Sequence, residues 1–238
     1  MGPPKVNRRR AYYARSGSTG RDLVALLHPP YTLWHLSFVA LGASLAAVVD
    51  WTRLWGTLAA FLLGLGVAAH ALDEVHTRPL GTGLSDRVLW SLGVGGMAAA
   101  AGVGVVGAYH ISAWVLAWAT AGIVLAAGYA LEWPRALHSN IGFALAWGSF
   151  PVLVGYWAQA ESLSPAVLLV AGAAFFLSMA QRRLSTPARF VRRETSHASA
   201  VFGAQRAWDE GELLETWEAP MRALVWAMPL LAVALLLR

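Results

Sequence analysis

Five ionisable side chains crowd into one short segment at the end of a long apolar stretch. They are His70, Asp73, Glu74, His76 and Arg78. Ionisable groups are costly within a bilayer, and those found there usually pair with one another or serve a function. The segment therefore predicts a functional site.

Helical geometry selects a subset of these residues. On a helix that turns about 100° per residue, His70, Asp73 and Glu74 share one face and His76 points away from it. An imidazole and a carboxylate at this spacing can ligate a divalent ion, or the carboxylate can orient the imidazole as a base. We interpret all three as candidate catalytic residues, and His70 with Asp73 as candidate metal ligands. A structural ion pair between Asp73 and Arg78 is the alternative.

The elements that must position these groups are membrane helices. Of the 238 residues, 57% are apolar and 13% charged, and the mean hydropathy is +0.52. Such a composition predicts an all-α, polytopic transmembrane helical bundle. Seven apolar windows have about the length that a helix needs to cross a bilayer core about 30 Å thick. They lie at residues 32–49, 54–72, 88–108, 113–131, 141–158, 166–179 and 219–237.

The basic residues predict the orientation and the organisation of the chain. With seven spans and a cytoplasmic N-terminus, every Lys and Arg except Arg53 and Arg238 falls on the inner side. We expect a basic cytoplasmic segment over residues 1–27, without a cleavable signal, and a single membrane domain over 28–238. Residues 181–218 would form a cytoplasmic loop or cap between the last two spans. This indicates a multi-pass protein of a prokaryotic cytoplasmic membrane.

Composition also limits the partners and the chemistry. The net charge of +5 arises from basic residues beside helices, at the level of lipid headgroups, which indicates contact with membrane lipids and not with nucleic acid. The absence of cysteine excludes disulfides, thiolate metal sites and cysteine nucleophiles. The oligomeric state is left open.

Further polar residues fall on the same predicted face of the membrane as His70. Pro79 ends the helix, and the loop Gly81-Thr82-Gly83 either presents N–H groups to a phosphate or serves as a plain connection. His110 is predicted to be an ordinary histidine on the outer side. The candidate substrate-binding residues are Arg78, Arg182, Arg183, His35, Glu132, His138 and Asn140.

Several of these segments resemble one family. Ala69-His70-Ala71-Leu72-Asp73, followed by Arg78-Pro79-Leu80-Gly81-Thr82-Gly83-Leu84-Ser85, resembles the first signature of the UbiA superfamily of intramembrane prenyltransferases. Residues 28–33 resemble the opening of the first helix of that family. Residues 129–138 resemble its inner loop, and 150–157 with 162–164 resemble the fifth span and outer loop of its menaquinone-type branch. The resemblance covers roughly residues 28–185.

The resemblance implies a helical bundle with a lipid-open cavity on the cytoplasmic side. In the family, two Asp-rich motifs there hold magnesium ions that bind the diphosphate of a prenyl donor. Matched residue by residue, the first motif has His70 and Thr77 in place of aspartates and keeps Asp73. The segment 180–184, where the second motif is expected, has no carboxylate. A two-magnesium clamp is therefore not expected, and the cofactor remains unknown, with a divalent metal left open.

Three interpretations of function remain open, and we favour the first. It is a divergent prenyltransferase, in which Arg78, Arg182 and Arg183 contact the diphosphate directly and His70 or Asp73 acts as the base. Snorkelling of Arg182 and Arg183 to the inner surface is the alternative for those two residues.

The other two interpretations assign different chemistry to the same residues. One is a metal enzyme or metal-binding protein, built from His70 with Asp73 or Glu74 and a further histidine, His35 or His76, with Glu132 and His138 left open as additional ligands. The other is a non-catalytic membrane subunit that binds a lipid or a quinone. An isoprenoid or quinone-like ligand would fit the first and the third interpretations.

Overall fold

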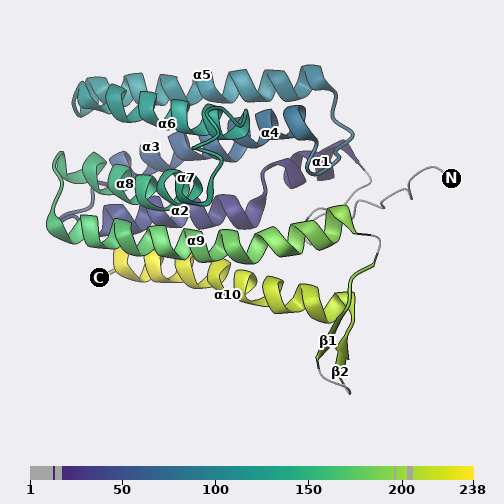
Figure 1. Cartoon of the computed structure of the whole chain (residues 1–238). Coiled ribbons are helices and arrows are strands. Elements are labelled where there is room, and N and C mark those ends of the chain that lie inside the picture. Colours follow the sequence, from purple (N-terminus) through teal and green to yellow (C-terminus); the bar gives the residue numbers. More distant parts are fainter. Residues whose placement is uncertain (1–12, 14–17, 196, 203–205) are drawn as a thin grey trace.

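The computed structural model describes residues 13, 18–195, 197–202 and 206–238. Its helices lie side by side along one common direction, with α5 at the top and α10 at the bottom of Figure 1. The predicted all-α bundle is confirmed, with one small hairpin added. Five helices are long and apolar enough to cross a membrane, which fits an integral membrane protein. They are Trp51–Thr77, Asp86–His110, Asn140–Ala160, Pro165–Glu194 and Glu210–Leu236.

Two of the seven predicted spans form shorter apolar helices. The first corresponds to α2, Pro29–Ser44, which follows the short helix α1, Thr19–Leu26. The fourth corresponds to α6, Trp114–Ala130. With 16 and 17 residues, α2 and α6 are shorter than the roughly 20 residues that a straight spanning helix needs. Length and composition alone thus support five of the seven spans.

Two of the long helices contain π-helical segments. The helix over 51–77 consists of α3, Trp51–Phe61, then η1, Leu62–Ala69, then α4, His70–Thr77. The helix over 140–160 consists of α7, Asn140–Ala144, then η2, Leu145–Ser149, then α8, Phe150–Ala160. Such segments are rare and often occur at functional sites. Here they place His70 directly after η1 and Trp147 inside η2.

The predicted cytoplasmic loop over 181–218 is largely helical. Helix α9, Pro165–Glu194, continues through Pro187 well past the end of the predicted sixth span. An antiparallel hairpin follows, in which β1, Ala200–Phe202, pairs with β2, Arg206–Trp208. Asp209 then forms a capping box with Glu212 and starts α10, Glu210–Leu236.

Helix α2 lies at the centre of a buried core that it forms with helices from the second half of the chain. Trp34 and Phe38 of α2 pack with Val152 of α8, Val167 of α9 and Met228 of α10. A second cluster joins η1 and α4 to α6 and to the helix over 140–160. Helix α5, Asp86–His110, covers α3, η1 and α4. The arrangement brings the ends of α2, α4, α6 and α9 together around one space.

Candidate functional site

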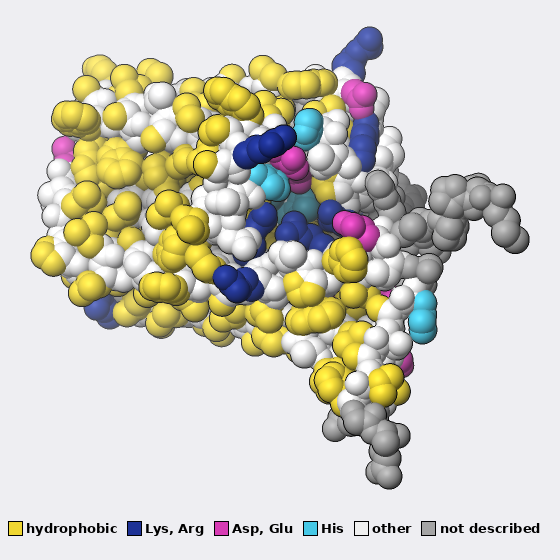
Figure 2. All heavy atoms as spheres, viewed as in Figure 1, with side chains coloured by type: hydrophobic (Ala, Val, Ile, Leu, Met, Phe, Trp, Pro, Cys, Tyr) yellow, Lys and Arg dark blue, Asp and Glu magenta, His cyan; other side chains and the backbone are white. Residues whose placement is uncertain are grey.

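A hollow at one end of the bundle collects arginine, histidine and acidic side chains (Figure 2). It lies between α4 and α9, on the end of the bundle that carries the start of α2. We call it the polar chamber. Its residues are His28, Tyr31, His70, Asp73, Tyr129, Arg182, Arg189 and Arg193, which interact electrostatically with one another.

Three arginines of the polar chamber come from a single face of α9. Arg182, Arg189 and Arg193 are spaced seven and four residues apart, which aligns them along a helix. Within the part of the chain that the structure describes, Arg189 and Arg193 donate no hydrogen bond and form no ion pair. Asp73 is a carboxylate within their electrostatic range. Two guanidinium groups beside one carboxylate leave an excess of positive charge that suits an anion.

Arg182 is buried and holds the connection between α6 and α7 in place. Its Nη1 donates to the hydroxyl of Tyr129 at 2.5 Å, its Nε to Oδ1 of Asn140 at 3.3 Å, and its Nη2 to the carbonyl of His138 at 3.3 Å. The guanidinium carbon also lies 5.0 Å from the ring centroid of Phe143. Arg182 therefore stabilises the chamber wall, and its donors are used within the chain.

Two histidine rings of the polar chamber lie against each other. The centroids of His28 and His70 are 4.3 Å apart, and Nδ1 of His70 donates to the carbonyl of Gly66 in η1 at 3.1 Å. Nδ1 of His28 is hydrogen-bonded to the hydroxyl of Tyr13 at 2.6 Å, and its buried Nε2 has no partner among the described residues. Burial, and then the neighbouring His70 and Arg193, hold the pKa of His28 well below its ordinary value. The His28 ring is therefore neutral at neutral pH.

The sequence pairs His70 with Asp73, and the structure places both in the polar chamber. Asp73 is half-buried, and among the described residues its carboxylate accepts one weak hydrogen bond, from the Thr77 hydroxyl at 3.5 Å. Within the described ranges, no group of three or more His, Asp or Glu side chains is arranged to hold a metal ion. An imidazole and a carboxylate are residue types that can transfer a proton or orient a ligand.

Glu74 and Arg78 serve the adjacent loop instead. Glu74 is fully buried and accepts hydrogen bonds from the backbone N–H of Leu80 at 2.9 Å and of Thr82 at 2.7 Å. Arg78 donates to the carbonyl of Leu84 at 2.8 Å and pairs with Asp86. The ion pair between Asp73 and Arg78, one of the sequence alternatives, is therefore replaced by a pair with Asp86.

The N–H groups of the glycine loop are likewise engaged by carboxylates of the chain. Besides the two bonds to Glu74, the N–H of Gly83 donates to Oδ2 of the buried Asp22 in α1 at 2.8 Å. A phosphate would have to displace these carboxylates to reach the loop. The loop is accordingly a rigid connection that is fastened to α1 and α4.

The remaining predicted residues divide between the chamber wall and the surface. His138 stacks on Tyr129 with centroids 4.7 Å apart, and its Nε2 lies 3.7 Å from a carboxylate oxygen of Glu132. Glu132 and Asn140 are exposed at the rim, although Asn140 accepts the bond from Arg182. Arg183 and His76 are exposed.

His35 connects the chamber wall to the middle of the bundle. It is buried, and its Nδ1 donates to the backbone carbonyl of Trp147 in η2 at 2.9 Å. Both His35 and His70 thus bond to carbonyls in or beside the π-helical segments. This arrangement fixes the ring orientation of each histidine.

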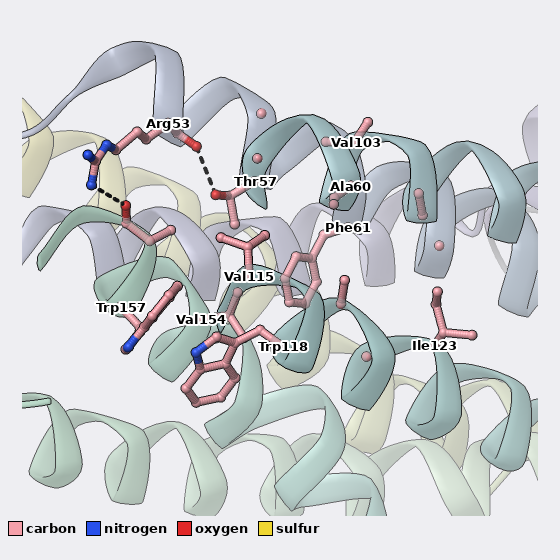
Figure 3. Close-up of a pocket in the computed structure, with 18 of the residues that line it drawn as sticks. Arg53, Thr57, Ala60, Phe61, Val103, Val115, Trp118, Ile123, Val154 and Trp157 are labelled. Carbon is pink, nitrogen blue, oxygen red and sulfur yellow. Dashed lines mark hydrogen bonds between the residues drawn. The ribbon is translucent and has the colours of Figure 1, made fainter. Parts of the chain in front are cut away.

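A cavity with mostly apolar walls lies within the bundle (Figure 3), and Trp147 is among the residues that line it. Its volume is about 550 Å³, and it is bounded by α3 with η1, α5, α6 and α8. In Figure 3 the side chains of Phe61, Val115, Trp118 and Val154 gather around it, and Arg53 lies at its edge. Its size is within the range of small-molecule and cofactor pockets. Nothing in the sequence separates these lining residues from ordinary spanning residues.

Comparisons of the chain with models of known protein families, with curated proteins and with solved structures found no match. They identify no family for this chain. The resemblance of residues 69–85 to the UbiA signature therefore stays a prediction. Function has to be inferred from the geometry of the polar chamber.

Proposed function

We propose that the chain is a divergent UbiA-like prenyltransferase of a prokaryotic cytoplasmic membrane. It binds an isoprenoid diphosphate in the polar chamber and transfers the isoprenoid to a lipophilic acceptor. The observation that supports this most directly is the pair Arg189 and Arg193, which face the chamber with no hydrogen-bonded partner among the described residues. Guanidinium groups bind phosphate oxygens in pairs of parallel hydrogen bonds and need no metal to do so.

The residues of the chamber suit the charges that such a transfer develops. The bond between C1 of the isoprenoid and the bridging diphosphate oxygen breaks, and its electron pair leaves with the diphosphate beside Arg189 and Arg193. A nucleophilic atom of the acceptor forms the new bond to C1. The proton that this atom loses goes to Asp73 or His70. The arginines stabilise the leaving-group charge that the magnesium ions stabilise in the family.

A non-catalytic lipid-binding or quinone-binding subunit is the second candidate. The observation that favours it is the structural use of Glu74 and Arg78, which leaves fewer groups of the segment 70–78 for chemistry. Release of diphosphate separates the two candidates. The transferase releases it when an acceptor such as a dihydroxynaphthoate is added, whereas a binding subunit holds the diphosphate lipid unchanged.

Replacing Arg189 or Arg193 should weaken the anion site. We expect Arg189→Gln and Arg193→Gln each to weaken binding of geranylgeranyl diphosphate about tenfold or more, since a hydrogen bond to a charged group contributes about 1.5–3 kcal/mol. The measurement is calorimetry on the purified protein in nanodiscs, with EDTA present to remove divalent metal.

Arg183→Gln is the matched control, because it removes the same charge from an exposed position of the same helix. Its affinity should equal that of the wild type. The proposal fails if all three variants bind equally well, or if EDTA alone eliminates binding to the wild type.

A further inference from the structure

The connection between α6 and α7 is set back from the end of the bundle that holds the polar chamber (Figure 1). Helices α5 and α6 pack against each other as an antiparallel pair, and α6 has 17 residues against 25 in α5. At 1.5 Å per residue, α6 therefore ends about 12 Å short of the start of α5. We call residues 131–137 the α6–α7 loop.

The α6–α7 loop borders the lipid that surrounds α6. This helix exposes Trp114 and Val124, and the loop continues the exposed apolar side with Leu131 and with Trp133, which is 76% exposed. A helix shorter than the hydrocarbon core is accommodated by local thinning of the bilayer, which brings the headgroups toward its ends. Tryptophan is enriched at the level of the headgroups. The exposed Trp133 thus places the loop at that level.

The loop carries two exposed charges of opposite sign. Arg135 is exposed and forms no hydrogen bond or ion pair within the part of the chain that the structure describes. Glu132 is also exposed, and its carboxylate lies 3.7 Å from Nε2 of His138, which is too long for a hydrogen bond. The loop therefore offers a guanidinium group to a phosphate and a carboxylate to an ammonium group.

We infer that the α6–α7 loop binds the headgroup of a zwitterionic phospholipid that has a primary ammonium group, such as phosphatidylethanolamine. Arg135 donates to the phosphate and Glu132 accepts from the ammonium, while Trp133 lies where the headgroup meets the acyl chains. A choline headgroup carries the same charges, but its quaternary ammonium has no N–H to donate. A glycerol headgroup has no ammonium for Glu132. The inference does not depend on the proposed function.

The α6–α7 loop is attached to α9 on both sides. Arg182 of α9 donates to the hydroxyl of Tyr129, which precedes the loop, and to the carbonyl of His138, which follows it. These bonds fix the loop beside the polar chamber. They do not involve the side chains of Glu132 and Arg135, so each of the two can be replaced while the attachment stays.

Native mass spectrometry with phospholipids of identical acyl chains tests the choice of headgroup. The wild type should bind phosphatidylethanolamine about tenfold or more tighter than phosphatidylcholine or phosphatidylglycerol, the effect of one hydrogen bond to a charged group. Glu132→Ala should remove this preference, and Arg135→Gln should weaken binding of all three lipids. Arg87→Gln is the matched control, because it removes the same charge from an exposed position at the start of α5 and should keep the preference.

Thermal unfolding of each variant checks that it is folded. Equal affinities of the wild type for phosphatidylethanolamine and phosphatidylcholine would overturn the assignment. The same holds if phosphatidylglycerol binds most tightly, or if Glu132→Ala keeps the preference.

The level of the loop is tested by fluorescence quenching in liposomes. The chain contains no cysteine, so Trp133→Cys creates a single site for a fluorescent label. A nitroxide on the lipid headgroup should quench this label more than a nitroxide near the end of the acyl chain. The order should be reversed for Val124→Cys, which lies near the middle of α6. Quenching of the label at position 133 by iodide in the water, and by neither lipid, would overturn the inference.

Discussion

Glu74→Gln should lower the free energy of unfolding by about 3 kcal/mol, since hydrogen bonds to a buried charged group contribute about 1.5–3 kcal/mol each. The carboxylate is fully buried, and both of its oxygens are in use. Oε2 accepts from the N–H of Leu80, and Oε1 accepts from the N–H and the hydroxyl of Thr82. The amide of glutamine keeps one acceptor and turns its NH₂ group toward a backbone donor. One N–H group of the loop is then left unsatisfied in a buried position.

Thermal unfolding in detergent, followed by tryptophan fluorescence, measures this effect. A loss of 3 kcal/mol corresponds to a midpoint lower by roughly 6–12 °C in a chain of this size. Asp73→Asn is the control on the neighbouring position, because Asp73 is half-buried and its carboxylate accepts only a weak hydrogen bond, from Thr77, within the described part of the chain. Equal midpoints for the two variants would show that Glu74 does not fasten the loop.

The positions of the helices can be predicted from apolar windows, and their ends cannot. Hydropathy falls at Gln181 and predicts that the sixth span ends at residue 179, yet α9 continues to Glu194. A helix is continued by its backbone hydrogen bonds and by tertiary packing, neither of which depends on hydropathy. In α9, Arg192 bonds to the buried Glu218 of α10 at 2.6 and 2.9 Å, which holds the polar turns in place. Because Glu218 lies beyond the hairpin, no sequence pattern near Arg192 predicts this pair.

Some features of the candidate site can likewise be predicted from the sequence, and others cannot. The spacing of His70 and Asp73 predicts a shared face, and both lie in the polar chamber. Local pattern cannot show that Glu74 bonds to the backbone six and eight residues ahead of it, because that depends on the conformation of the loop. The bond between His35 and Trp147 joins residues 112 positions apart, which no local pattern reveals.

Arg189 and Arg193 do have a signal in the sequence. Together with Arg182 they repeat at intervals of seven and four residues, the period of one helix face. A span that ends at residue 179 leaves the basic residues after it as loop charges. A helix extended through Pro187 places the three arginines together. An error in one helix boundary thus removes two of the chamber residues from the prediction.

Gly42→Ala and Gly155→Ala should each destabilise the protein by about 3 kcal/mol or more, the upper part of the range for overpacking. Helices α2 and α8 touch backbone to backbone at these two positions. A Cβ on Gly42 would lie 2.1 Å from the carbonyl oxygen of Val152, and a Cβ on Gly155 would lie 2.1 Å from that of Val39. The helices would have to move apart, because backbone atoms cannot rotate away as a side chain can. Small residues commonly permit such close approach between membrane helices.

Moving α2 away from α8 should also disturb the chamber wall. Helix α2 carries His35, and the helix over 140–160 carries the carbonyl of Trp147 to which His35 donates. We therefore expect a lower unfolding midpoint together with weaker binding of geranylgeranyl diphosphate in both variants. Gly172→Ala in α9 is the matched control, because a Cβ there meets nothing within 4 Å. It should raise the midpoint slightly, as alanine favours a helix over glycine by about 1 kcal/mol. If Gly42→Ala behaved like Gly172→Ala, the close contact of α2 with α8 would not be what holds the chamber wall.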